Sequence, residues 1–178
     1  DSDPQTDDQT ALYLQRWVGV VAGPEEPLGL IDSGAAMGLV GSGTLRRLSA
    51  RLAPHGLAIE TLPGRPKVAA GIGGQASVVA ARRVPLALSP TLTGHLEVLE
   101  LSSPTVPLLL PGPVLEKLGC ILDYGSGEIT LAGERLAFER KGAHIYLPVL
   151  DQKGLKLLAS STPAARKQAA ANTDSPGT

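Results

Sequence analysis

The chain has 178 residues, and its 21 Gly and 15 Pro leave little room for long uninterrupted helices. Three Tyr, one Trp and one Phe are few aromatic residues for a core of this size, so Leu, Val, Ile and Ala should supply the buried area. The length fits one domain and disfavours a two-lobed enzyme with a cleft between its lobes. Sixteen basic and seventeen acidic residues give a formal charge of −1, which provides no overall field for nucleic acid or an anionic membrane.

The residues that bind metals and form disulfides are sparse. Cys120 is the single cysteine, so an intrachain disulfide and a thiolate metal cluster are both excluded, and it fits a small buried apolar residue better than a nucleophile. The three histidines, at 55, 95 and 144, show no ligand spacing. We therefore expect no metal and no cofactor.

The chain shows no targeting signal that would fix its location. No apolar run reaches the roughly 18 residues that span a bilayer, so no membrane partner is expected. The first ten residues are polar and acidic, the reverse of a secretory signal. The missing initiator Met suggests a segment of something longer, and the location of the protein stays open.

Composition divides the chain into a central domain and two flanks. Residues 1–12 and 151–178 are expected to be flexible, because both ends are polar and the second is rich in Ser, Thr, Ala and Gln. Residues 13–150 should form the domain. There, short apolar runs separated by turn signals predict an antiparallel all-β fold.

The elements expected in this domain follow from periodicity and turn residues. Leu45, Leu48 and Leu52 repeat at helical spacing and predict a helix over 43–52, which Pro54 ends. The later elements expected are strands at 58–62, 67–70, 77–82, 84–88 and 95–101, a short helix at 113–118, a hairpin at 120–131 that turns at 125–127, and a strand at 144–149. Arg82 and Arg83 follow a glycine cluster, and we favour a solvated pair over a substrate contact for them.

The most informative stretch is LGLIDSGAAMGLV at 28–40, where Asp32 directly follows an apolar strand. A carboxylate at such a place is costly unless hydrogen bonds hold it or it has a chemical task. An isolated Asp-Ser-Gly is usually a simple turn. The residues around this one favour a functional interpretation.

The segment Leu30-Ile31-Asp32-Ser33-Gly34-Ala35 resembles the active-site turn of retropepsin-like aspartic proteases. The segments before it, RWVGVV, AGPEEP and LGLI, look like the opening hairpin of that family. GIGGQ at 71–75 is placed like its glycine-rich flap, and residues 106–131 are similar to its second apolar run, short helix and final hairpin. The resemblance covers residues 13–150.

This resemblance implies a closed antiparallel β-barrel with one or two short helices, active as a homodimer. It also implies an endopeptidase that hydrolyses peptide bonds of an extended substrate, in the processing of a retrotransposon-like polyprotein. Peptide hydrolysis by this route needs two carboxylates that share a proton. The chain offers no second Asp-Ser/Thr-Gly, since Asp123 lacks the Ser or Thr and Asp151 lacks the Gly, so Asp32 of a second copy should complete the pair.

The resemblance assigns further residues to the site. Ser33 braces the catalytic turn, and Gly34 allows a close backbone approach to the twofold axis. Ala35, beside them, is expected to contact substrate. Ile72, Gly73 and Gly74 would form the flap that closes over the peptide.

Two departures keep an alternative open. Ala36 stands where relatives often carry a polar residue, and Leu110 is followed by Pro111, with Gly112 one position late. Either departure suits a decayed copy of the fold that serves as a dimerisation or peptide-binding module without catalysis.

Other motifs fail on residue identity or context. GIGGQA at 71–76 matches a dinucleotide fingerprint, but Pro85 stops the helix that it should open, and no βαβ unit surrounds it. The segment at 41–44 lacks the Lys of a phosphate-binding loop, and the chain has no Gly-x-Ser-x-Gly. We expect no nucleic-acid partner for this segment.

Overall fold

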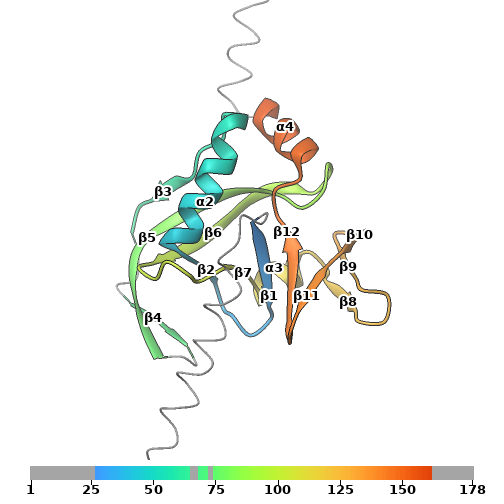
Figure 1. The fold of residues 1–178 in the computed structure, drawn as a ribbon, viewed down its shortest axis with the longest axis horizontal. Coiled ribbons are helices and arrows are strands. Elements are labelled where there is room, and N and C mark those ends of the chain that lie inside the picture. Colours follow the sequence, from blue (N-terminus) through green and yellow to red (C-terminus); the bar gives the residue numbers. More distant parts are fainter. Residues whose placement is uncertain (1–26, 65–67, 72–73, 162–178) are drawn as a thin grey trace, which may run out of the picture.

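A computed structural model describes residues 27–64, 68–71 and 74–161 (Figure 1). The strands are β1 (Leu28–Asp32), β2 (Gly38–Gly41), β3 (Glu60–Leu62), β4 (Val68–Gly71), β5 (Gly74–Ala87), β6 (Thr93–Leu101), β7 (Leu108–Pro111), β8 (Ile121–Asp123), β9 (Glu128–Leu131), β10 (Glu134–Ala137), β11 (Glu139–Lys141) and β12 (His144–Pro148). The helices are α2 (Ser42–Leu52), the 3-10 turn η1 (Ala53–His55), α3 (Gly112–Lys117) and α4 (Gln152–Ser161). The expected flank 1–12 and the first arm of the expected opening hairpin lie outside the described residues.

The strands form three sheets. One has the order β11-β12-β1-β7, a second β10-β9-β8, and a third β2-β6-β5-β3, with β4 paired to β5. The mostly β composition agrees with the prediction, but the described residues form no closed barrel, and the pairing is not wholly antiparallel. β1 runs parallel to β7, and β2 runs parallel to β6.

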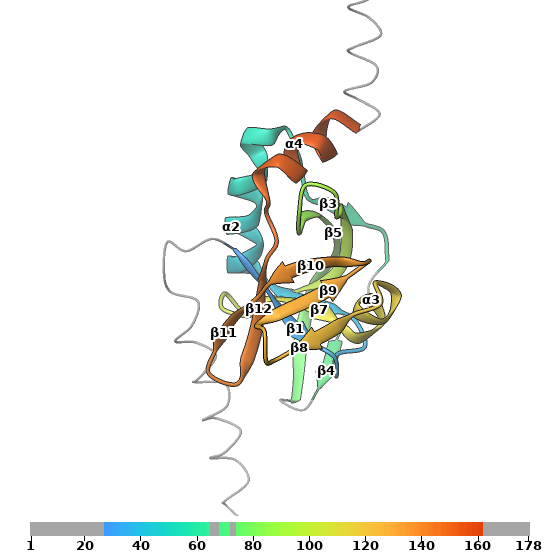
Figure 2. The ribbon, with the colours of Figure 1, turned by 90° about the vertical axis from the view of Figure 1, so that its right-hand side faces the viewer.

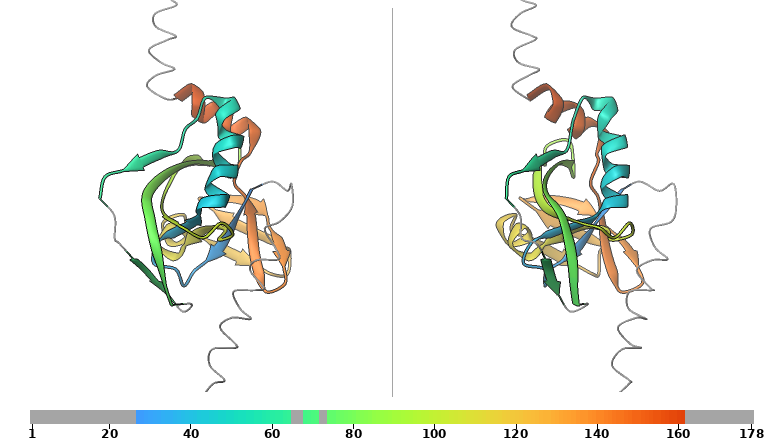
Figure 3. Two further views of the ribbon diagram at one scale, coloured as in Figure 1. Left: turned by 60° about the vertical axis from the view of Figure 1, so that its left-hand side comes forward. Right: turned by 90° about the vertical axis from the view of Figure 1, so that its left-hand side faces the viewer.

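The prediction of two strands at 77–82 and 84–88 was wrong, because β5 is one long strand (Figure 3). Arg83 pairs with Glu97 and Val84 with Leu96, so the ladder with β6 continues through the expected break. Pro85 is tolerated inside it because β3 pairs only with residues 81–83 of β5, which leaves the other edge at Pro85 without a partner strand.

The core is aliphatic, as the composition predicted. Its largest fully buried side chains in the described part are Leu, Ile and Val, and Tyr146 is the one buried aromatic residue there. One cluster joins both long helices to all three sheets, and it includes Leu48, Val84, Leu110, Ile129, Leu147 and Leu155. The helix expected at 43–52 is confirmed as α2, whose Leu45, Leu48 and Leu52 are buried.

Helix α4 corrects the expectation that a flexible tail begins at residue 151. Gly154, Leu155 and Leu158 of this helix are buried, and the Asp151 carboxylate accepts a hydrogen bond from the Gly154 N–H at 2.8 Å. This bond satisfies an unpaired donor in the first turn. The domain therefore extends to Ser161. No helix in the described ranges is long and apolar enough to cross a membrane.

Candidate active site at the Asp32 turn

Asp32 is the last residue of β1, the strand that lies between β12 and β7. Leu30 is buried, and Ile31 and Asp32 are half-buried, so the chain leaves the core at this residue. In the parallel pairing of β1 with β7, Asp32 stands opposite Pro111. Burial of the apolar part of β1 thus fixes where the carboxylate emerges.

Hydrogen bonds order the turn that follows Asp32. The Gly34 N–H donates to Oδ1 of Asp32 at 3.1 Å, and the Ala35 N–H donates to the Asp32 carbonyl at 3.2 Å. The side chain is therefore held by its own turn, because an Asp carboxylate commonly accepts a hydrogen bond from the backbone N–H two residues later. Ser33 and Gly34 are exposed, while Asp32 and Ala35 are half-buried, so the turn is presented at the surface.

The start of α3 supports this turn from behind. The Gly112 N–H donates to the Ala35 carbonyl at 3.0 Å, and a Cβ placed on Gly112 would stand 2.6 Å from the Ser33 carbonyl oxygen. Only glycine leaves room for that approach. Leu110 is followed by Pro111 and then by Gly112, one position later than in the family that the sequence resembles. This order places Gly112 against the turn, and Asp32 keeps its pairing with Pro111.

Strands β4 and β5 flank the glycine-rich segment for which a flap is predicted. β4 and β5 pair antiparallel, with Gly71 opposite Gly74. Gly74 is thus placed at the hairpin end, while Ile72 and Gly73 lie outside the described residues. Figures 1 and 2 place this hairpin and the β1–β2 connection at the same end of the molecule, away from α4.

The two other aspartates considered above serve turns of their own. Oδ1 of Asp123 accepts hydrogen bonds from the N–H groups of Gly125 and Ser126, and hydrogen bonding, with Ser126 as the largest contributor, holds the Asp123 pKa below its ordinary value. Asp151 bonds the first turn of α4. Both aspartates therefore order local turns, but neither stands in an Asp-Ser/Thr-Gly sequence, and the described residues hold no group of three or more metal-ligating side chains.

An ion pair between β5 and β6 that includes a buried carboxylate was missed from the sequence. Glu100 of β6 is buried and pairs with Arg82 of β5 at 2.7 Å, and it also accepts a hydrogen bond from the Ser42 hydroxyl at 2.8 Å. The expected solvated pair is therefore correct only for Arg83, which bridges the exposed Glu60 and Glu97. Arg82 pairs with Val98 in the ladder and Glu100 with Ala80, so the two charges are diagonal neighbours whose proximity becomes visible only once the register is known.

Comparison with known proteins adds the following. No protein-family model matches the chain, and no curated protein matches it. Among solved structures, the retroviral protease-like domain of Ddi1 from Leishmania major is 14% identical, with a TM-score of 0.43, over 66% of this chain and 94% of that one. The EIAV protease in complex with the inhibitor HBY-793 is 16% identical, with a TM-score of 0.36, over 57% of this chain and 96% of that one. At these low identities and TM-scores, we base the proposed function on the Asp32 turn and on neither structure.

Proposed function

We propose that this chain is an aspartic endopeptidase of the retropepsin type. The observation that carries the proposal is the Asp32 turn. A carboxylate ends an apolar strand, is oriented by the Gly34 N–H at 3.1 Å, and is supported by Gly112. These contacts orient a carboxylate at the surface. The fold does not use it in an ion pair, because the described residues give Asp32 no cationic partner.

Catalysis requires a second carboxylate beside the first. The ionised member of the pair takes a proton from a water molecule, which then attacks the scissile carbonyl. The protonated member donates a hydrogen bond to the carbonyl oxygen, and the two groups titrate as one pair. Each chain carries one suitable turn, so we propose that Asp32 of a second copy supplies the partner across a twofold axis.

The remaining site residues would position the substrate. Ser33 and Gly34 shape the turn, and Ala35 beside them would contact the peptide backbone. The segment with Ile72, Gly73 and Gly74 would pair with an extended peptide as an added strand and exclude water. An extended segment of a polyprotein, such as that of a retrotransposon, is the substrate that this arrangement suits.

The test compares two aspartates with the same local geometry. Asp32→Asn and Asp123→Asn both replace a carboxylate that accepts a hydrogen bond from the glycine N–H two residues later. Cleavage of a mixed pool of quenched fluorescent peptides at mildly acidic pH should vanish in the first variant and persist in the second. Cleavage that survives Asp32→Asn would refute the proposal, and a stable dimer that cleaves nothing would favour a non-catalytic binding module.

A further inference from the structure

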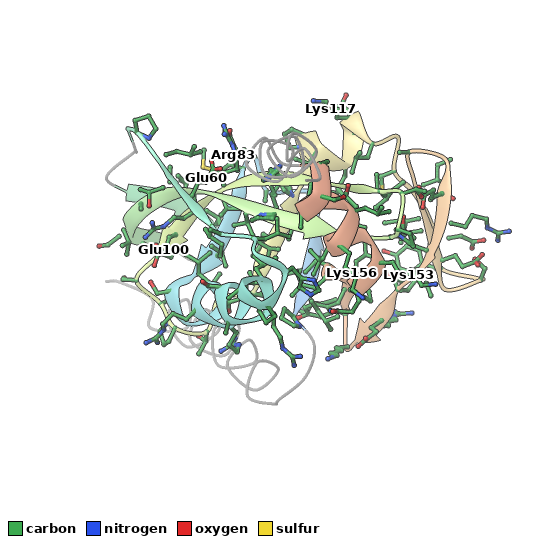
Figure 4. The ribbon with its side chains drawn as sticks, turned by 90° about the horizontal axis from the view of Figure 1, so that it is seen from above. Glu60, Arg83, Glu100, Lys117, Lys153 and Lys156 are labelled. Atoms are coloured by element: carbon green, nitrogen blue, oxygen red, sulfur yellow. The ribbon has the colours of Figure 1, made fainter. Side chains whose placement is uncertain are left out.

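Helices α2 and α4 together carry a group of cationic side chains, and α4 lies at the end of the molecule away from the β1–β2 connection (Figure 1). These side chains are exposed, and we call them the basic surface: Arg46, Arg47 and Arg51 of α2, with Lys153 and Lys156 of α4. Figure 4 looks down on this end and shows the two helices side by side, with Lys153 and Lys156 on α4. Their inward faces share one core cluster, so their relative position is fixed.

A polar contact also joins the two helical segments. His55, which follows α2 in η1, lies 3.0 Å from Gln152 of α4, measured between Nε2 and Oε1. Leu52 and Leu155 are fully buried beneath them. The five cations of the basic surface are therefore held in fixed positions relative to one another, and their electrostatic fields add.

No carboxylate of the described residues forms an ion pair with the basic surface. α2, η1 and α4 contain no Asp or Glu, and Asp151, just before α4, is engaged by the Gly154 N–H. Arg47 donates to the Thr44 hydroxyl at 3.0 Å, and no ion pair in the described part involves any of the five cations. Arg47 and Arg51 are also like charges at i and i+4, which disfavours a helix by a few tenths of a kcal/mol.

The near-zero net charge of the chain conceals a strong separation of charge. Residues 1–26 contain six acidic side chains and one arginine, whereas residues 27–161 contain thirteen basic and ten acidic side chains. Four of the six acids are Asp1, Asp3, Asp7 and Asp8. Without Arg65 and Lys67, which the structure does not describe, the described residues carry eleven basic and ten acidic side chains, so the excess of negative charge lies in the segment before β1.

That segment joins the fold beside the basic surface. Leu28, the first residue of β1, pairs with Pro148 of β12, and the chain passes from β12 through Val149 to Asp151 and α4. When extended, the residues between 10 and 28 span up to about 3.3 Å each. Their total reach therefore exceeds the length of α2, which rises about 1.5 Å per residue. Residues 1–10 can therefore reach every cation of the surface.

We propose that the acidic segment 1–10 docks on the basic surface of its own chain through salt-sensitive ion pairs. The occupant follows from charge complementarity and from the place where the segment enters the fold. The contact involves no residue of the Asp32 turn, so it stands or falls independently of the proposed protease activity. External polyanions, such as a DNA oligonucleotide, should compete with the segment for the same five cations.

Zero-length crosslinking tests the contact directly. A carbodiimide joins a carboxylate to an amine only where the two already touch, so the full chain should yield amides between aspartates 1–8 and Lys153 or Lys156. These products should exceed those to Lys117 and Lys141 several-fold. They should fall when the salt concentration rises from about 0.01 M to 1 M, because the Debye length shrinks from about 30 Å to 3 Å. Mixing isotope-labelled and unlabelled chains shows whether each product forms within one chain, as proposed.

Two matched variants sharpen the test. Arg51→Glu and Lys117→Glu change the charge equally, and both replace the basic residue in the last turn of a helix. The first should lower crosslinking to α4 several-fold, and the second should leave it unchanged. Equal effects of the two variants, or products spread evenly over all lysines, would overturn the proposal.

A second measurement uses the competitor. Replacing Asp1, Asp3, Asp7 and Asp8 with Asn should tighten binding of a DNA oligonucleotide, because the segment no longer occupies the surface. Unchanged oligonucleotide affinity would show that the surface is free in the native chain, and would contradict docking by the segment.

Discussion

Gly112 stands directly against Ser33, so that a Cβ on Gly112 would lie 2.6 Å from the Ser33 carbonyl oxygen. This contact joins the first turn of α3 to the turn that holds Asp32, and the bond from the Gly112 N–H to the Ala35 carbonyl reinforces it. The catalytic turn that we propose therefore depends on a residue far along the chain.

The first prediction concerns this contact. Gly112→Ala should lower the free energy of unfolding by about 1–3 kcal/mol, because the added methyl group forces two backbone segments apart. It should also lower peptide cleavage, since the Asp32 turn must move. Gly94→Ala is the control, because a Cβ at Gly94 meets no atom within 4 Å. Chemical denaturation of both variants checks the prediction, and equal stabilities would contradict it.

The second prediction compares neighbouring arginines on β5. The Arg82 side chain is 24% exposed and pairs with the buried Glu100, whereas that of Arg83 is 41% exposed and pairs with exposed carboxylates. Arg82→Ala should cost about 3–5 kcal/mol because it leaves a buried charge without its partner. Arg83→Ala should cost far less. Adding Glu100→Gln to Arg82→Ala should restore part of the lost stability. Urea unfolding of all variants measures these differences, and equal losses in Arg82→Ala and Arg83→Ala would contradict the prediction.

The third prediction tests whether α4 belongs to the folded domain. Leu155 is fully buried and Leu157 is 56% exposed on the same helix. Leu155→Ala should lower stability by about 2–5 kcal/mol, because it removes core contacts and leaves a cavity. Leu157→Ala, the same substitution on the outer face, should change stability little. If both variants unfold at the wild-type midpoint, α4 is not part of the cooperative unit.

The fourth prediction concerns acid stability. Hydrogen bonds from the hydroxyls of Ser89 and Thr91 hold the pKa of Glu134 below its ordinary value of 4.5. A carboxyl group whose pKa is lowered by folding stabilises the folded state at pH values above its ordinary pKa. This stability is lost as the pH falls through the pKa of the folded state. Glu134→Gln should therefore flatten part of the decline in stability below pH 4.5. Denaturation at several acidic pH values measures this, and parallel curves for variant and wild type would count against it.

Local patterns were enough to predict several parts of the molecule. The leucine spacing of 45, 48 and 52 predicted α2, and the apolar run before Asp32 predicted a strand that delivers a carboxylate to a turn. Gly71 and Gly74 of the glycine cluster stand opposite each other in the β4–β5 pairing, and the flap role of this segment stays a prediction. In each case, residues close in sequence determine the feature.

Other parts depend on distant contacts and were not predictable in the same way. The parallel pairing of β1 with β7 joins segments that no local pattern connects. Pro85 suggested a strand break, but β6 holds β5 together across it. For α4, the polar composition of the tail obscured a usable signal, namely Asp151 at the N-cap followed by Leu155 and Leu158 at helical spacing.

The central claim is that two copies of Asp32 form one catalytic pair, and mixing wild-type and Asp32→Asn chains tests it most directly. The chains are unfolded together and refolded at a fixed total concentration, with half of them carrying the substitution. If each active site needs two intact chains, about a quarter of the wild-type cleavage rate should remain, since random pairing makes about a quarter of the dimers fully wild type. A remaining rate of about one half would show that each chain acts alone, and would contradict the paired site.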